Sequence, residues 1–424
     1  MIRSKIRTAW AMPGARAGTI VLAASLVGHL GNYLYYVIAG HMLGTARFAD
    51  VSVMIALAAI IYTPFSGLQA TVARDVARLQ GSGDRAGLSG YVRLLGRRVG
   101  PVLVALALAL AAVVPLITSW LRLETPWLAA LAVVWVMLWV VLLIGAAIAQ
   151  GLERFGTVAF QFAGPQGLLR PLLLPLGVLA VGISGSMLAM IVATLVGLVV
   201  LLPPVRYALS ATPRPVTSIK VAGPVMALVS FAVITNADQL TAKVVLSDAG
   251  AGLYSAAALL GKIALFTPAA LAFVLLPRVS VARARGEDPS SQVLVTMGVT
   301  AVTGLGITAV LALMPPEFLE LTFGADFAGA RPLLGPLGLV MTGAAMLNVH
   351  IAAGLASMER WVGPGLALLA GLCLGLLAVL HDSPFQIVGA IGIAVVVGLV
   401  LAEWLSDSGI VRSVIRLARK RAAR

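Results

Sequence analysis

Residues 231–278 read FAVITNADQLTAKVVLSDAGAGLYSAAALLGKIALFTPAALAFVLLPR, and this stretch decides the fold. Most of it is apolar, and its pattern predicts two membrane-spanning helices joined by a turn at residues 247–252. The polar exceptions in the two helices are Asn236, Asp238, Gln239, Lys243 and Lys262. An ionisable side chain at the centre of a bilayer costs about 2.5–3.5 kcal/mol on insertion scales. Such groups are therefore expected to face a partner or a water-filled cavity. Without a catalytic cluster, this favours a transporter.

The composition is that of an integral membrane protein. Of the 424 residues, 60% are hydrophobic and 11% are charged, and the mean hydropathy is +1.03. A soluble domain carries about 25% charged residues. Apolar runs of about 20 residues, each long enough to cross a bilayer of roughly 30 Å, recur along the chain. They predict an all-α fold with twelve transmembrane helices, at approximately residues 17–42, 48–73, 99–118, 127–149, 157–181, 184–205, 219–246, 252–277, 292–314, 331–356, 362–380 and 384–405.

The distribution of basic residues predicts the topology. A net charge of +14 would also fit a nucleic-acid-binding protein, but the basic residues lie in short loops between the spans. Twelve spans place both termini on one side, and the opposite loops hold only Arg47, Arg122, Lys243 and Arg331. Since Lys and Arg gather in cytoplasmic loops, both termini are expected in the cytoplasm and the protein in the cytoplasmic (inner) membrane. No nucleic acid is expected as a partner.

The C-terminal tail, residues 409–424, can form a basic amphipathic helix. Its apolar residues fall on one helical face and its arginines on another. Such a helix would lie on the anionic cytoplasmic leaflet, with membrane lipids as its partners. The alternative is a charged tail without a specific role.

Several kinds of functional site are missing from the sequence. The single cysteine, Cys373, lies in an apolar run, so no intrachain disulfide can form. The sequence contains no G-x-x-x-x-G-K-[ST] loop, no H-E-x-x-H and no cysteine–histidine metal set. No outside loop is long enough for a catalytic domain. We therefore expect no enzyme activity, no cofactor and no metal, and a driving force from an ion gradient, the membrane potential or consumption of the substrate outside.

Polar and proline residues recur at matching places in the two halves of the chain. Asn32 corresponds to Asn236, and Thr63-Pro64 corresponds to Thr267-Pro268. Six spans per copy is an even number, so the halves would share one orientation and be related by an axis along the membrane normal. This predicts an N-terminal lobe at residues 1–210 and a C-terminal lobe at residues 211–408, which rock in alternating access.

Short motifs along nearly the whole chain resemble those of the polysaccharide flippases, which belong to the multidrug/oligosaccharidyl-lipid/polysaccharide exporter superfamily. The motifs are LG at 43–44, FADVS at 48–52, QGLERF at 150–155, NAD at 236–238, LPR at 276–278 and FGADF at 323–327. The resemblance implies a V-shaped bundle of two six-helix lobes around a central cavity. It also implies a lipid-linked anionic saccharide as substrate and glycan-synthesis enzymes as candidate partners. Peptidoglycan-precursor flippases typically have more spans than twelve, which argues against that branch.

Six polar residues within the spans are the candidates to line this cavity: Arg170, Asp238, Lys262, Asn32, Asn236 and Gln239. Lys262 would meet a substrate phosphate or sugar carboxylate, and the guanidinium of Arg170 could bind pyrophosphate bidentately. Three alternatives stay open. Asp238 and Lys262 could form an ion pair that only fixes helix packing, Arg170 could snorkel towards the interface, and the amides could join helices by hydrogen bonds. His29 is either a proton relay or a packed neutral histidine.

Three functions are weighed. The first is flipping of a lipid-linked oligosaccharide or polysaccharide repeat unit from the inner to the outer leaflet. The second, on the same fold, is cation-coupled efflux of drugs or metabolites, which requires an anionic cavity, whereas Arg170 and Lys262 outnumber Asp238. The third is a membrane-embedded glycan polymerase or ligase, which needs a large outer loop that the sequence lacks.

Overall fold

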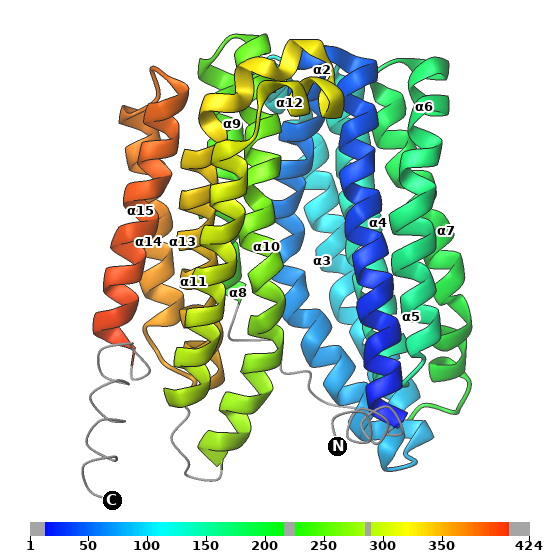
Figure 1. The fold of residues 1–424 in the computed structure, drawn as a ribbon. Coiled ribbons are helices and arrows are strands. Elements are labelled where there is room, and N and C mark those ends of the chain that lie inside the picture. The colour runs from blue at the N-terminus through cyan, green and yellow to red at the C-terminus, as the bar shows by residue number, and fades with distance from the viewer. Residues whose placement is uncertain (1–12, 216–224, 285–289, 407–424) are drawn as a thin grey trace, which may run out of the picture. The chain divides into compact units, whose positions relative to one another are not determined.

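The computed structural model describes residues 13–215, 225–284 and 290–406. In this part of the chain every regular element is a helix and there is no β-strand (Figure 1). The elements are α2 (Pro13–Gly81), α3 (Arg85–Trp120), α4 (Pro126–Gly151), α5 (Phe155–Gln161), η1 (Phe162–Leu169), α6 (Arg170–Val181), α7 (Ser184–Leu209), α8 (Val225–Ile234), α9 (Ala237–Val245), α10 (Asp248–Ala284), α11 (Ser290–Leu313), α12 (Pro316–Phe323), η2 (Ala325–Ala330), α13 (Arg331–Ala356), α14 (Val362–Val379) and α15 (Pro384–Leu405). The tail helix predicted at residues 409–424 lies outside the described residues.

The number of membrane crossings follows from the length of α2. Eleven helical stretches of the described residues are long and apolar enough to cross a membrane. The first, Ala23–Gly81, has 59 residues, which amounts to roughly 90 Å of helix, about three times the hydrocarbon thickness. Its backbone leaves helical geometry at Gly44, where φ is +68°, a value that glycine adopts without a Cβ clash. This stretch therefore crosses twice, and the predicted all-α fold with twelve transmembrane helices is confirmed.

The seventh span differs from the single helix predicted at residues 219–246. It is broken between α8 and α9, where Asn236 Nδ2 donates a hydrogen bond to the carbonyl of Ala232 at 2.8 Å. A short amide side chain that bonds to nearby backbone competes with the helical hydrogen bonds, which explains the break. The turn predicted at residues 247–252 is shorter than expected, because α10 already begins at Asp248.

Prolines shape the fifth span. Residues Phe162–Leu169 (η1) form a π-helix between α5 and α6, with Pro165 inside it and Pro171 in the first turn of α6. Proline has no backbone N–H and its ring clashes with the preceding turn, so the regular hydrogen-bond ladder cannot continue through it. Such π-helical turns are frequent at functional sites. In this span the wide turn carries Gln166, four residues before Arg170, and both residues are buried.

The chain folds into two compact units, and the first half of the sequence contributes to both of them. Unit 1 consists of Met1–Leu43 and Ile61–Ala222, and unit 2 consists of Gly44–Ile60 and Gly223–Arg424. The middle of α2 therefore belongs to unit 2, although both flanking parts of the same helix belong to unit 1. The lobe boundary predicted near residue 210 stays a prediction.

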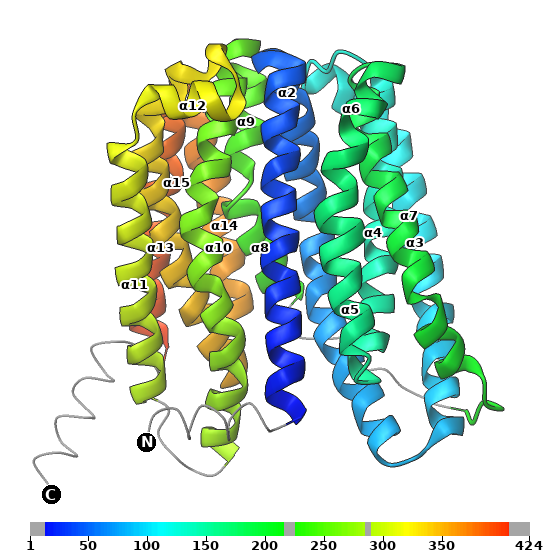
Figure 2. The same ribbon diagram turned by 45° about the vertical axis from the view of Figure 1, so that its right-hand side comes forward.

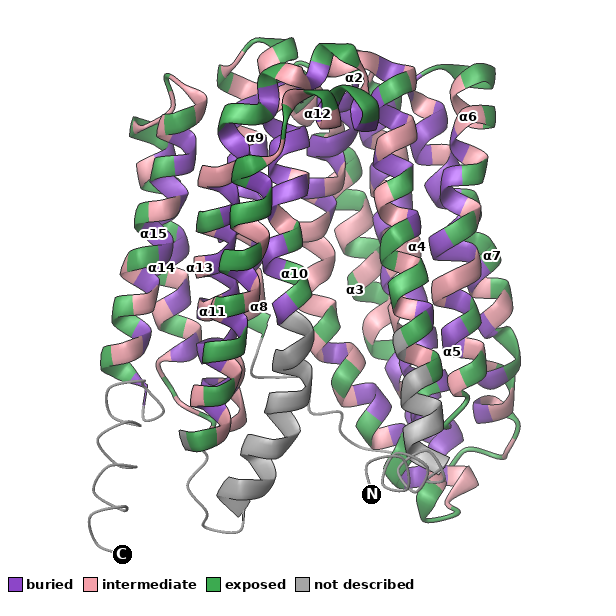
Figure 3. Cartoon of the chain, viewed as in Figure 1, coloured by how far each residue is buried: buried purple, intermediate pink, exposed green. Residues whose placement is uncertain are grey.

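Each unit has its own packed interior. In unit 1 one core cluster joins α2, α3, α4 and α7 through Val72, Leu88, Ile148 and Ala208, among others. In unit 2, α10 packs against α11 and α13, and α14 packs against α8 and α15 (Figure 2). Buried residues gather along α9 and the neighbouring end of α10, whereas exposed residues recur along α15 (Figure 3). The apolar window of α3 is only 6% buried, as expected of a helix that faces lipid.

A glycine in α2 permits a close approach to η1 within unit 1. A Cβ atom on Gly31 would overlap the backbone carbonyl of Gly167. We expect Gly31→Ala to destabilise the purified protein by about 1–3 kcal/mol, the usual cost of overpacking, and so to lower its thermal midpoint. The backbone of Gly167 cannot rotate away from the added methyl group as a side chain could. The matched control is Gly96→Ala in α3, where a Cβ meets nothing within 4 Å and alanine is expected to add about 0.5–1 kcal/mol. Equal midpoints for the two variants would contradict this packing.

Candidate functional site

Arg170, the first residue of α6, is buried in an aromatic surrounding within unit 1. Arg170 is only 5% exposed. The guanidinium carbon lies 4.7 Å from the ring centroid of Trp139 and 5.6 Å from that of Trp135, both on α4. Tyr62, on α2, lies 5.8 Å from Trp139 and 6.4 Å from Trp135 between ring centroids. We call Trp135, Trp139 and Tyr62 the aromatic cage, and its two tryptophan rings stabilise the guanidinium by cation–π attraction.

Several buried polar atoms at the aromatic cage and in the neighbouring η1 have no hydrogen-bond partner in the described part of the chain. They are Nε and Nη2 of Arg170, Nε1 of Trp139, and both side-chain amide atoms of Gln166. Buried polar groups in proteins are normally hydrogen-bonded, so each of these atoms requires an explanation. Within residues 13–215, 225–284 and 290–406, no carboxylate lies within 4.0 Å of Arg170. The positive charge of Arg170 is therefore held without a direct ion pair.

Unit 2 has a polar site at the break between α8 and α9. Lys262 Nζ, on α10, donates to Asn236 Oδ1 at 2.7 Å. Asp238 Oδ2 accepts a hydrogen bond from the hydroxyl of Tyr254 at 3.1 Å, and its Oδ1 has no hydrogen-bond partner among the described residues. Asp238 is fully buried, and Gln239 is buried beside it on α9. Asp238 and Lys262 interact electrostatically, but the hydrogen bond of Lys262 goes to the side-chain amide of Asn236 and not to a carboxylate.

The structure thus places four of the six predicted cavity residues in unit 2: Asn236, Asp238, Gln239 and Lys262. Lys262 contacts Asn236 and interacts electrostatically with Asp238, so the cavity role and the ion-pair alternative both stay predictions. Asn32 and His29 lie on α2 in unit 1, where Asn32 is half-buried and His29 is exposed. Their roles in a cavity or a proton relay stay predictions.

Sequence reasoning missed a buried charge cluster in unit 2. Lys243 Nζ lies 2.7 Å from Asp50 Oδ1 and 2.7 Å from Asp248 Oδ1. The side chains of Lys243 and Asp50 are 2% and 4% exposed, whereas that of Asp248 is 54% exposed. Lys243 was predicted to lie near the outer end of the seventh span and was counted with the basic residues of the outside, and it lies in α9. Only the nearby Asp248 gave a local signal, because Asp50 is distant in sequence.

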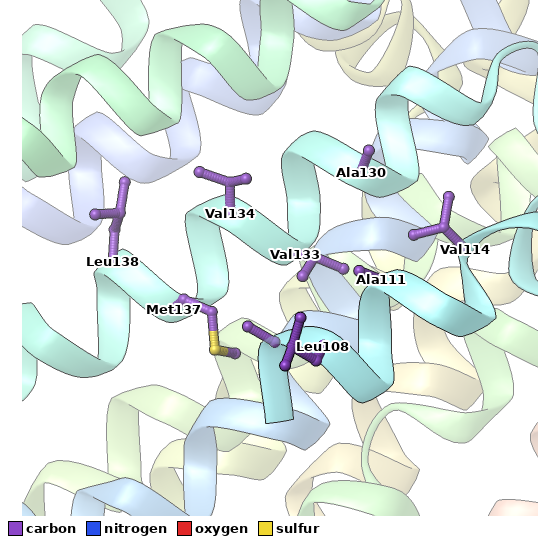
Figure 4. Close-up of a pocket in the computed structure, with 9 residues that line it drawn as sticks. Leu108, Ala111, Val114, Ala130, Val133, Val134, Met137 and Leu138 are labelled. Atoms are coloured by element: carbon purple, nitrogen blue, oxygen red, sulfur yellow. The ribbon is translucent and has the colours of Figure 1, made fainter. Parts of the chain in front are cut away.

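An apolar groove of about 540 Å³ lies between α3 and α4 in unit 1 (Figure 4). It is lined by Ala107, Leu108, Ala111, Val114, Ala130, Val133, Val134, Met137 and Leu138. The lining residues of α4 lie on the face opposite to Trp135 and Trp139, since the two sets differ by about half a helical turn. Without a polar side chain, the groove suits hydrocarbon chains and not a polar headgroup.

Comparison with known proteins identifies the fold. No family model and no curated protein sequence matches this chain. An inward-facing multidrug resistance MATE family transporter of the MOP superfamily has a TM-score of 0.72 at 13% identity, covering 91% of this chain and 97% of that one. The lipid II flippase MurJ in an inward closed conformation has a TM-score of 0.67 at 11% identity, covering 94% and 88%. The fold is that of MOP superfamily transporters.

A third solved structure has a similar fold. It is a MOP superfamily transporter from Pyrococcus furiosus, described as having a binding pocket of reverse polarity that suggests a different function. Its TM-score is 0.61 at 15% identity, and it covers 92% of this chain and 95% of that one. These solved structures are transporters and not enzymes. In this chain, both polar sites offer fixed charges and hydrogen-bond donors within membrane helices, which is the chemistry of binding.

Proposed function

We propose that the protein flips a lipid-linked oligosaccharide or polysaccharide repeat unit from the inner to the outer leaflet of the cytoplasmic membrane by alternating access. One observation carries the proposal. Each unit holds a cation in a membrane span, Arg170 and Lys262, and neither has a carboxylate in salt-bridge contact among the described residues. Lys262 interacts with the Asp238 carboxylate only beyond salt-bridge distance. A charge at membrane depth that is incompletely compensated is costly, and an anionic sugar-phosphate headgroup would compensate it. A neighbour of the same fold is described as a lipid II flippase, which supports a lipid-linked cargo.

The second candidate is cation-coupled efflux of a cationic drug or metabolite. Asp238 favours it, because this carboxylate is fully buried with one oxygen unpartnered in the described part of unit 2. Neighbours described as multidrug resistance MATE transporters have the same fold. Asp238 already accepts from Tyr254 and interacts with Lys262, so we place efflux second.

The experiment compares the two cargoes in parallel assays. The purified protein is reconstituted in liposomes with a dye-labelled polyprenyl-pyrophosphate amino sugar, and dithionite quenching reports how fast the inner-leaflet dye reaches the outer surface. In a parallel arm, everted vesicles are assayed for uptake of ethidium. We expect faster quenching of the lipid-linked sugar than in empty liposomes and no ethidium uptake. Ethidium uptake without lipid flipping would overturn the proposal in favour of efflux.

The proposal includes the membrane orientation and the two lobes predicted from the sequence. Both termini would lie in the cytoplasm, lobes 1–210 and 211–408 would be the moving parts, and glycan-synthesis enzymes would supply the lipid-linked substrate. Because the single cysteine, Cys373, is buried, a Cys373→Ala background lets cysteines added at either terminus be labelled selectively. Labelling of both by an impermeant maleimide only after the cells are opened is the expected result. Labelling in intact cells would reverse the orientation.

A further inference from the structure

One edge of the Arg170 guanidinium, within unit 1, has two N–H groups that could bind a ligand. The nitrogens without a hydrogen-bond partner among the described residues are Nε and Nη2, whose N–H bonds lie on one edge of the guanidinium and point the same way. The cation–π contacts with Trp139 and Trp135 supply no hydrogen-bond acceptor atom for these two N–H groups. A pair of parallel N–H donors matches two oxygens of one carboxylate or phosphate. A single-atom anion such as chloride must accept both N–H bonds at one point, which bends the bonds away from linearity.

Two further polar groups share this region. Trp139 belongs to the aromatic cage, and its Nε1–H has no acceptor in the described part of the chain. Gln166 lies one helical turn before Arg170 and is 4% exposed. A Cβ on Gly197 of α7 would lie 3.3 Å from Gln166 Nε2 and 3.0 Å from Leu142, one turn along α4 from Trp139. Gln166, Trp139 and Arg170 therefore gather where α4, α7 and the fifth span meet.

We propose that Arg170, Trp139 and Gln166 form an oxyanion site inside unit 1 that binds a phosphate group. The Arg170 edge would hold two oxygens, and the Trp139 indole N–H and the Gln166 amide N–H would each bind a further oxygen, which a tetrahedral phosphate has and a carboxylate lacks. Gln166 Oε1 would accept from a protonated phosphate or an adjacent sugar hydroxyl. A cation surrounded by apolar rings is little screened by water, so the attraction is stronger than at the surface.

The phosphate has two possible sources, the headgroup of a polyprenyl-phosphate lipid or free inorganic phosphate. That the phosphate belongs to the transported lipid rests on the proposed function, whereas the site itself does not. The aromatic cage distinguishes this site from the polar site of unit 2. There, Lys262 Nζ already donates to Asn236, and a lysine ammonium lacks the paired donors of a guanidinium.

The experiment measures binding to the purified full-length protein by isothermal titration and by tryptophan fluorescence. The probes are inorganic phosphate and pyrophosphate in one arm, and a short polyprenyl monophosphate in nanodiscs in the other, with chloride at equal ionic strength as the control. We expect Arg170→Gln to weaken phosphate binding about 10–100-fold, because it removes charged hydrogen bonds. Arg170→Lys keeps the charge and is expected to recover only part of the affinity. Trp139→Phe keeps the ring, loses the donor and should weaken binding about 2–10-fold.

Arg154→Gln is the matched control, since Arg154 also stacks on an aromatic ring, 5.6 Å from Tyr207, but is exposed. It is expected to bind phosphate as the unchanged protein does. Size-exclusion profiles and thermal midpoints establish that each variant is folded, and Arg170→Lys serves if Arg170→Gln is not. Binding of free phosphate supports a free-ion site, and binding of the lipid alone supports a headgroup site. Unchanged affinity in Arg170→Gln, or binding of neither probe by the folded wild-type protein, would overturn the site. If phosphate binds at Arg170 while the labelled lipid is not flipped, the proposed function fails and the site stands.

Discussion

Replacing Lys243 by methionine is expected to leave unit 2 without a stable fold. Methionine has a similar length and suits an apolar interior, so the change removes the charge and little of the packing. It leaves the Asp50 carboxylate, which is 4% exposed, without its nearest opposite charge. Removing one partner of a buried ion pair costs about 3–5 kcal/mol, a large share of the roughly 5–15 kcal/mol that holds most proteins folded. We expect strongly reduced membrane yield and a much lower thermal midpoint in detergent.

Two further variants locate the cause of this loss. Asp248→Asn removes the other carboxylate that contacts Lys243, but its side chain is 54% exposed, so the expected cost is only about 0–1 kcal/mol. The double variant Asp50→Asn with Lys243→Met removes the stranded charge and is expected to regain most of the lost stability. If Lys243→Met and Asp248→Asn prove equally stable, the buried pair with Asp50 does not carry the stability assigned to it.

Replacing Lys262 by glutamine is expected to lower the flipping rate about 30-fold or more without unfolding the protein. A glutamine can still donate to Asn236 Oδ1, so the variant removes the charge while a donor remains for the amide at the break between α8 and α9. Lys262 is half-buried, so we take the lower end of the roughly 2–5 kcal/mol that is lost when one partner of a buried hydrogen-bonded charge pair is removed, and each 1.4 kcal/mol is a factor of ten. The measurement is dithionite quenching of the labelled lipid in liposomes that contain equal amounts of protein.

The control for Lys262→Gln is Arg97→Gln, which removes the same charge from an exposed position on α3. Its flipping rate is expected to stay within about twofold of wild type, since exposed charges contribute little. A thermal midpoint unchanged by either substitution would show that the rates report transport and not folding. Wild-type flipping by Lys262→Gln would remove unit 2 from the cationic binding surface and leave only Arg170.

The sequence predicted the fold well, because hydropathy is a collective signal, whereas the topology inferred from the basic residues stays a prediction. Twelve apolar runs remain recognisable even where a boundary is wrong, as at the shortened turn before Asp248. The π-helix at residues 162–169 and the break at Asn236 were not predicted, because each span was expected to be a single helix. Proline and asparagine mark a disturbance in a helix, but which hydrogen bonds replace the lost ones depends on neighbouring helices.

In the candidate sites, too, the sequence reveals single unusual residues but not the contacts between helices. Arg170, Asp238 and Lys262 stand out in sequence because each is ionisable in an apolar run. The aromatic cage does not, because tryptophan and tyrosine are ordinary components of membrane helices and their facing partners come from other spans. The pairing of Lys243 with Asp50 depends on a contact between residues far apart in the chain, and no local pattern reveals it.

The assignment of residues 44–60 to unit 2 has a consequence for dividing the polypeptide. A fragment beginning at residue 223 would lack Asp50, which neutralises Lys243, and Phe48, whose ring lies 5.7 Å from Phe323 and 5.2 Å from Phe327. The second half is therefore not a self-sufficient product of translation. During synthesis, the contacts between residues 44–60 and the rest of unit 2 can form only after the later helices have been inserted into the membrane.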